Sequence, residues 1–91
     1  MRVAVTFPIP EAAKGLLSDM FDCRFWESEV PIPAETLAEW LVDVEGVLTT
    51  LTCPLNQAAL SGAAHLKVIS TVSVGVDHID VEFAQSRKIA I

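Results

Sequence analysis

Residues 66–80 read LKVISTVSVGVDHID, and this stretch decides the fold that we expect for the chain. Its first part is rich in β-branched side chains, which favours a strand over Leu66–Thr71. Gly75 then allows a tight turn, because glycine tolerates backbone conformations that other residues avoid. Asp77 and Asp80 are both suitable amino-terminal caps for a helix that follows. A strand, a turn and a helix in direct succession are typical of one unit of a parallel α/β sheet.

The same alternation of strand and helix extends over the rest of the chain. Runs of β-branched and apolar residues predict further strands at Arg2–Thr6, Cys23–Trp26, Val47–Leu51 and Ile89–Ile91. Apolar residues at helical spacing predict helices over Pro10–Met20, from Pro33 to a stop at Gly46, and from Pro54 to a stop at Gly62. Short helices between strands favour right-handed crossovers and a parallel sheet. The fold class is therefore predicted as α/β, an open parallel sheet with helices on both faces.

Composition limits what the chain could do. Of its 91 residues, 52% are apolar and 20% are charged, which predicts one compact domain and excludes intrinsic disorder. The formal net charge is -6, and the six Lys and Arg residues are scattered along the chain. Without a basic stripe to neutralise phosphates, we expect no nucleic-acid partner.

No membrane or secretory segment is expected either. The uncharged segment Gly46–Leu66 contains Pro54, Asn56 and Gln57, so its hydropathy is too low for a membrane span. No signal peptide is visible at the amino terminus, and we therefore expect a cytoplasmic protein.

The two cysteines and two histidines do not suggest a metal site. Cys23 and Cys53 lie far apart in the sequence, and in a reducing cytosol they are expected to be buried thiols rather than a disulfide. No two of these four residues show the close spacing that holds a tetrahedral zinc ion. No metal ligand is therefore assigned.

The end of the chain is apolar, which is unusual for a carboxyl terminus. Residues 88–91 read KIAI and look like a strand, whereas a natural terminus is usually polar and exposed. We therefore expect the chain to be the front part of a longer protein with an incomplete sheet. A complete small domain that ends on its edge strand is the alternative.

Two segments that follow predicted strands are candidates for binding. In open parallel sheets, ligands bind beyond the carboxyl ends of the strands. Thr49–Pro54 is rich in hydroxyl groups, and Ser70–Asp80 contains the turn at Gly75 just before a helix start. Backbone N–H groups of such a turn could hold a carboxylate through charge-assisted hydrogen bonds of about 1.5–3 kcal/mol each. Taken alone, a turn of this kind is more often structural than ligand-binding. No dinucleotide or P-loop fingerprint is present.

Residues 66–80 closely resemble the segment L-K-V-I-S-T-x-S-V-G-x-D-H-x-x of the D-isomer-specific 2-hydroxyacid dehydrogenases, in particular the glyoxylate and hydroxypyruvate reductases. The order of the predicted elements agrees with the amino-terminal region of that family, as do Pro31–Pro33 and Gly46–Leu51. The resemblance implies an NAD(P)-dependent reductase with two lobes, a flavodoxin-like substrate domain and a dinucleotide-binding domain. Residues 1–91 would be the amino-terminal part of the substrate-binding (catalytic) domain, without the dinucleotide-binding domain.

The same resemblance implies which residues meet the substrate. The backbone N–H groups of Val74 and Gly75 would hold the carboxylate of a 2-oxo acid, and Leu51 would lie near its 2-substituent. The family's catalytic arginine, histidine and glutamate lie further along the chain, so no catalytic or cofactor-binding residue is assigned. His78 belongs to the family's D-H pair and is expected to pack on the turn at a helix start, whereas His65 is expected to be exposed.

Two further expectations concern the three arginines and the residue that follows the last helix. Arg2, Arg24 and Arg87 fall at strand starts or a helix end, and none is assigned to the substrate. The family often has glycine after the last helix, where this chain has Lys88. If Lys88 must adopt φ > 0, the strain is about 1–2 kcal/mol.

The leading hypothesis is therefore a part of a reductase that converts glyoxylate or hydroxypyruvate to the D-2-hydroxy acid. Its partners would be a small 2-oxo or 2-hydroxy carboxylate, the dinucleotide-binding domain, and a second copy in a full-length homodimer. The full-length protein would use NAD or NADP, while the chain alone would bind neither and would be inactive. The alternative is a stand-alone flavodoxin-like binding or interaction module. A third possibility is a barely stable piece with bare apolar surface, in which Val68–Val76 promotes aggregation.

Overall fold

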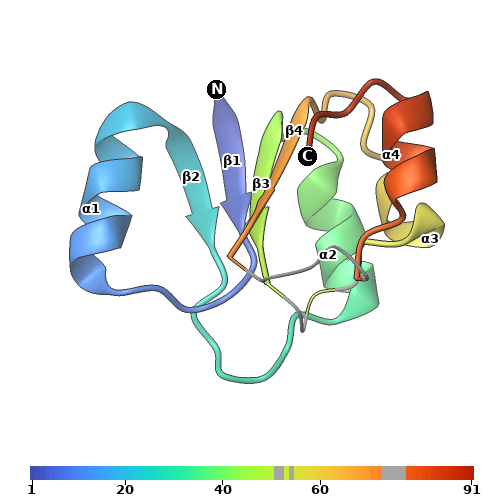
Figure 1. The fold of residues 1–91 in the computed structure, drawn as a ribbon. Coiled ribbons are helices and arrows are strands. Elements are labelled where there is room, and N and C mark those ends of the chain that lie inside the picture. The colour runs from blue at the N-terminus through green and yellow to red at the C-terminus, as the bar shows by residue number, and fades with distance from the viewer. Residues whose placement is uncertain (51–52, 54, 73–77) are drawn as a thin grey trace.

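The computed structural model describes residues 1–91 except 51–52, 54 and 73–77. In the described part, a sheet lies between α1 on one side and α2, α3 and α4 on the other (Figure 1). The strands are β1 (Arg2–Val5), β2 (Asp22–Phe25), β3 (Gly46–Thr49) and β4 (Val68–Thr71). The helices are α1 (Glu11–Met20), α2 (Ala34–Leu41), α3 (Gln57–Leu60) and α4 (Val81–Ser86).

The described strands form one parallel sheet in the order β2-β1-β3-β4. Ala90 adds a parallel bridge to Val68 on the outer side of β4, where a next strand would lie. The Ile69 N–H donates to the Ala90 carbonyl at 2.7 Å, and the Ala90 N–H donates to the Lys67 carbonyl at 2.9 Å. This order is the one found in flavodoxin-like folds. The predicted α/β class with a parallel sheet is confirmed.

The main core lies between the sheet and helices α2, α3 and α4. Ala4, Val47 and Ile69 are neighbours across β1, β3 and β4, and all three belong to this core. Among the helical side chains packed against them, Leu37 and Leu60 are almost fully buried. Burying a leucine side chain contributes about 1.5–3 kcal/mol, so this face supplies most of the packing energy.

The opposite face of the sheet is covered only in part. Helix α1 contains no buried residue, and Leu16 and Met20 are 68% and 70% exposed. An apolar groove of about 220 Å³ lies beside this helix, lined by Leu17, Leu48, Val68 and neighbouring side chains. The groove matches the expectation of bare apolar surface on this lobe. Leu16 and Met20, which the helical pattern assigns to a packed face, are exposed because α1 reaches only part of the sheet.

The predicted end of α2 is wrong, whereas the predicted stop of α3 at Gly62 is confirmed. Helix α2 ends at Leu41, and Gly46 is the first residue of β3 rather than a helix stop. A Cβ atom on Gly46 would lie 3.3 Å from Cγ1 of Val68 and 3.6 Å from Cγ2 of Val3, so this glycine suits close packing between two neighbouring strands. Helix α3 ends at Leu60, before Gly62.

Side-chain caps start the two short helices. The Ala59 N–H donates to Oδ1 of Asn56 at 2.9 Å, so Asn56 caps α3, whereas Pro54 lies outside the described residues. The Phe83 N–H donates to Oδ1 of Asp80 at 3.0 Å, which makes Asp80 the cap of α4. The other candidate cap, Asp77, lies outside the described residues.

Helix α4 ends in a left-handed residue that is not glycine. Lys88 has φ 60°, so the conformation expected at this position is confirmed. The Ile89 N–H donates to the Ala84 carbonyl and the Lys88 N–H donates to the Gln85 carbonyl, which is the Schellman pattern of helix ends. The lysine therefore occupies a position that favours glycine.

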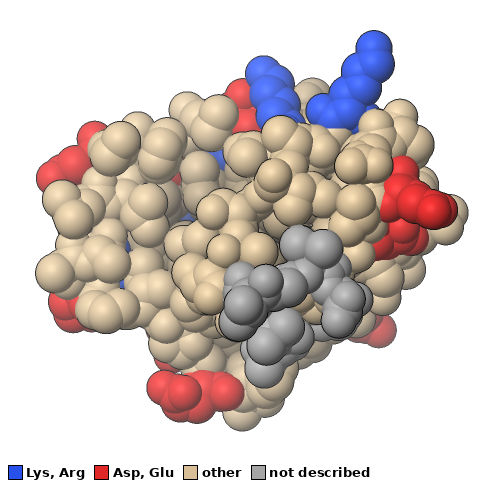
Figure 2. Space-filling model, in the orientation of Figure 1, with Lys and Arg blue, Asp and Glu red and all other residues tan. Residues whose placement is uncertain are grey.

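Charged side chains lie mostly at the rim of the face shown in Figure 2. Lys and Arg stand at its upper edge, Asp and Glu are scattered around it, and most of its centre carries neither. No helix in the part of the chain that the structure describes is long and apolar enough to cross a membrane.

Candidate functional site

The two candidate segments are held together at the carboxyl edge of the sheet. The Val72 N–H, just after β4, donates to the carbonyl of Thr49 at the end of β3, at 3.1 Å. Further along both segments, the Leu55 N–H donates to the His78 carbonyl at 2.7 Å, and the Asp80 N–H donates to the Leu55 carbonyl at 2.8 Å. The two segments are therefore hydrogen-bonded to each other near both of their ends.

The residues predicted to bind the substrate lie within these segments. Leu51, Val74 and Gly75 all lie outside the described residues, so their role stays a prediction. The structure does place the residues that flank them. Cys53, two positions after Leu51, is 1% exposed. His78, which comes directly after residues 73–77, is half-buried.

A row of threonines crosses the sheet at this edge, directly beside the candidate segments. Thr6 follows β1, while Thr49 and Thr71 end β3 and β4 and are neighbours in the sheet register. The Thr6 hydroxyl lies 3.2 Å from the Leu48 carbonyl and 3.3 Å from Oγ1 of Thr49. Thr6 is 3% exposed and Thr49 is fully buried, so their hydroxyls find partners inside the protein, as buried hydroxyls must.

The local sequence does not predict this row of threonines. Thr49–Pro54 is recognisable as rich in hydroxyl groups, but Thr6 lies more than forty positions earlier in the chain. The strand register brings Thr6 and Thr49 together, and register depends on pairing between distant segments. The only available signal was a threonine at the end of the runs Arg2–Thr6 and Leu66–Thr71 and within the run Val47–Leu51.

His78 contacts the last threonine of this row, Thr71. Its Nε2 lies 3.2 Å from Oγ1 of Thr71, which makes a hydrogen bond between the two ends of the segment 72–77. Its Nδ1 is buried and has no hydrogen-bond partner among the residues that the structure describes. The ring is thus engaged with Thr71, whereas the residues of the expected turn, 73–77, lie outside the described part of the chain. His65 is exposed, as expected.

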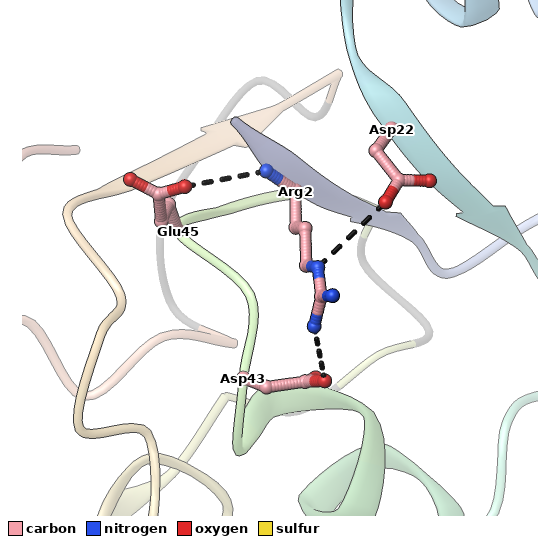
Figure 3. A network of polar contacts seen from close by, with 4 residues as sticks. All are labelled: Arg2, Asp22, Asp43 and Glu45. Atoms are coloured by element: carbon pink, nitrogen blue, oxygen red, sulfur yellow. Dashed lines mark hydrogen bonds and ion pairs between the residues drawn. The ribbon is translucent and has the colours of Figure 1, made fainter.

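The arginine at the start of β1 lies at the opposite end of the sheet, in a network of carboxylates (Figure 3). Nη1 of Arg2 lies 2.9 Å from Asp43, and its Nε lies 3.6 Å from Asp22. The backbone N–H of Arg2 donates to Glu45 at 3.4 Å, and this bond, helped by Lys67, holds the pKa of the Glu45 carboxyl below its usual value. Arg2 is therefore engaged in ion pairs at this edge of the sheet.

Hollows at this amino edge do not suit an anionic substrate. One of about 190 Å³ is lined by Cys23, by Arg2 and Arg24, and by Asp22 and Asp43, among others. Because the two carboxylates balance the two arginines, this hollow has no net positive charge to attract a 2-oxo acid. Burial, with a smaller effect of the Asp22 charge, raises the pKa of the Cys23 thiol, which disfavours a nucleophilic thiolate there.

The other two arginines lie over aromatic rings, and Cys53 is buried as expected, whereas Cys23 is only half-buried. Arg24 lies over the ring of Trp40 and Arg87 over the ring of Phe83, each about 5.5 Å from the ring centre, so neither points to a substrate role. Cys23 and Cys53 are both free thiols. The clustering of paired segments, hydroxyls and an imidazole makes the carboxyl edge the candidate site.

Comparison with known proteins identifies the relatives of this fold. The model of the family "D-isomer specific 2-hydroxyacid dehydrogenase, catalytic domain" matches residues 3–91. The chain belongs to this family. It is 36% identical over 90 residues to a glyoxylate reductase of Pyrococcus furiosus, which covers 99% of this chain and 27% of the relative. It is 37% identical over 94 residues to the glyoxylate reductase/hydroxypyruvate reductase of Mus musculus, covering 100% of this chain and 29% of the relative.

Solved structures share the fold of this 2-hydroxyacid dehydrogenase family member. A crystal structure of a Thermus thermophilus protein aligns over 98% of this chain and 29% of that one, with a TM-score of 0.89 and 31% identity. An NADPH-dependent glyoxylate/hydroxypyruvate reductase from Sinorhizobium meliloti, solved in complex with citrate, aligns over 97% of this chain and 26% of that one. Its TM-score of 0.72 at 24% identity shows the shared fold alone. The chain spans less than a third of the length of these relatives.

Proposed function

We propose that the chain is the amino-terminal part of the substrate-binding domain of an NAD(P)-dependent reductase that acts on a small 2-oxo acid of the glyoxylate or hydroxypyruvate type. The carboxyl edge of the sheet receives the acid. Backbone N–H groups of Val74 and Gly75 bind its carboxylate, and Leu51 contacts its 2-substituent. Hydride comes from a nicotinamide held by a second domain, and the acid and base of the reaction lie outside this chain.

The observation that carries the proposal is the family match over residues 3–91, together with 36% and 37% identity to reductases named for these substrates. The geometry supports it, because the segments containing Leu51 and Gly75 are joined at the sheet edge where parallel folds bind ligands. The proposal also includes a cytoplasmic, homodimeric full-length enzyme that pairs mainly through the second domain.

The stand-alone binding module is not favoured, because the relatives that this chain matches are reductases. The two hypotheses predict different coding sequences. An enzyme requires a G-x-G-x-x-G motif within about one hundred residues after Ile91, since that motif holds the pyrophosphate of the cofactor. An immediate stop codon in an intact reading frame would favour the module.

Enzyme assays test the proposal. The protein encoded by the whole reading frame is mixed with NADH or NADPH and with glyoxylate or hydroxypyruvate, and loss of the reduced cofactor is followed by its absorbance. We expect turnover by the whole protein and none by the 91-residue chain, which lacks a cofactor fingerprint. Turnover by the isolated chain, or a whole protein that reduces neither acid, would refute the assignment.

Substitution at the turn sharpens this test. In the whole protein, Gly75→Val adds a branched side chain where backbone N–H groups must approach the substrate, so KM for the 2-oxo acid should rise about tenfold or more. Gly15→Val is the matched control, because a Cβ on Gly15 meets nothing within 4 Å. It should leave KM unchanged, and equal KM values for the two variants would contradict the proposed carboxylate site.

A further inference from the structure

The candidate site consists of two segments that follow β3 and β4, and one side-chain contact spans the second of them. Thr71 ends β4, and His78 comes immediately before the bridge between Leu55 and Ile79. Their side chains meet with Nε2 of His78 3.2 Å from Oγ1 of Thr71. This contact joins positions seven residues apart, on either side of the proposed carboxylate site.

The backbone around this pair links it to the first segment as well. The His78 carbonyl accepts from the Leu55 N–H at 2.7 Å, so a shift of His78 would move the end of the segment that contains Leu51. At the other end, Thr71 is the sheet neighbour of Thr49, whose carbonyl accepts from the Val72 N–H. The Thr71–His78 contact therefore lies where both candidate segments are anchored.

The buried Nδ1 of His78 indicates which group donates in this hydrogen bond. Nδ1 has no partner among the described residues. A buried unpaired acceptor is tolerated better than a buried unpaired N–H donor. We therefore assign the ring proton to Nε2, which donates to Oγ1 of Thr71. In this tautomer Nδ1 is the unprotonated nitrogen.

From these observations we infer that Thr71 and His78 form a positioning pair for the 2-oxo acid site. Neither side chain is assigned to the substrate. Their hydrogen bond sets the separation of the ends of segment 72–77, and through Leu55 it sets the position of the neighbouring segment. The inference rests on the proposed function for its ligand, but the hydrogen bond and its effect on the two segments can be measured without any ligand.

The first test uses the unliganded chain. Thr71→Val keeps the branched shape but removes the acceptor, Thr71→Ser retains it, and Ser70→Ala is a matched control that removes a hydroxyl from the adjacent, exposed position of the same strand. Hydrogen exchange is measured at the amides of Leu55, Val72 and Asp80, whose hydrogen bonds join the two segments.

In Thr71→Val these three amides should exchange about fivefold faster than in the wild type, whereas Thr71→Ser and Ser70→Ala should leave them unchanged. Amides in the middle of β1 report whether each variant is folded. Equal exchange in wild type and Thr71→Val would overturn the inference. Long-range ¹H–¹⁵N correlations of the His78 ring should show the proton on Nε2, and a proton on Nδ1 would overturn the donor assignment.

The second test adds sodium glyoxylate to the same variants. Thr71→Val should raise the dissociation constant about fivefold, and Thr71→Ser should restore it. Glyoxylate binding that is equally tight in all variants would contradict the positioning role while leaving the proposed function intact. A wild-type chain that binds no glyoxylate would count against the proposed function, and the exchange experiment would still decide the role of the pair.

Discussion

At the scale of single residues, Lys88 has an unfavourable backbone conformation and Glu45 has a carboxylate that its neighbours stabilise. Lys88 has φ 60°, a conformation that costs an L-residue with a side chain about 1–2 kcal/mol. Glu45 depends on the backbone N–H of Arg2 and on Lys67, which together lower the pKa of its carboxyl. Both effects lead to measurable changes in stability.

Replacement of Lys88 by glycine should stabilise the chain. Lys88→Gly removes the left-handed strain and should raise the free energy of unfolding by about 1 kcal/mol in urea titrations. Lys88→Ala is the matched control, because alanine also has a Cβ atom and keeps the strain. If the two variants are equally stable, the strain at this helix end does not exist.

Glu45 should make the chain sensitive to acid. Because the folded state lowers the pKa of this carboxyl, its contribution is fully present at neutral pH and is lost as the pH falls through the folded value. The free energy of unfolding should therefore fall less between about pH 7 and about pH 3 in Glu45→Gln than in the wild type. The control Glu29→Gln, at an exposed position between β2 and α2, should retain the wild-type slope. If the free energy of unfolding of Glu45→Gln falls with pH as steeply as that of the wild type, Glu45 does not contribute to this acid sensitivity.

At the scale of elements, capping side chains decide where the shortest helices begin. Helix α3 has four residues, too few to be stable without packing and caps. Asn56 accepts the Ala59 N–H, and Asp80 does the same for Phe83 at the start of α4. Helices α3 and α4 follow the two candidate segments in the chain, so their caps also fix where these segments end.

Loss of the Asn56 cap should destabilise the chain. Asn56→Ala should lower the free energy of unfolding by about 1 kcal/mol, and Asn56→Asp should restore it, because a carboxylate accepts the same N–H. Gln57→Ala, at the adjacent exposed position, should have little effect. Equal losses in Asn56→Ala and Gln57→Ala would mean that the cap contributes nothing.

Much of this element order could be predicted from sequence, and the exceptions share one cause. β-branched runs and helical spacing located the strands and helices to within a few residues, and Asp80 was recognised as a cap. Gly46 was misread as a helix stop because its real role, close packing between β1 and β4, depends on strand register. The threonine row and the Thr71–His78 contact also depend on pairing between distant segments, which local patterns do not contain.

At the scale of the whole molecule, the two faces of the sheet differ. One face packs against three helices, whereas the other has α1 and an open apolar groove lined by Leu48 and Val68, among others. Relatives are more than three times as long as this chain. An apolar groove of this kind, left open to water, favours association and dye binding.

The isolated chain should therefore bind the dye ANS and associate as its concentration rises. Leu48→Thr combined with Val68→Thr places threonine, which favours strands, at both positions and makes the groove more polar, so both effects should weaken. Leu16→Thr with Met20→Thr is the control for exposed apolar residues on α1. Sedimentation and ANS fluorescence measure the outcome. A wild-type chain that stays monomeric at high concentration and binds no dye would contradict this prediction.

We propose above that the carboxyl edge of the sheet binds a small 2-oxo acid through the backbone N–H groups of Val74 and Gly75. The most direct test is a titration of the ¹⁵N-labelled chain with sodium glyoxylate, followed by amide chemical shifts. We expect saturable shifts that are largest at Val74 and Gly75, with smaller ones at Val72 and His78. Saturable shifts centred on Arg2 at the opposite edge, or none at Val74 and Gly75, would contradict the proposal.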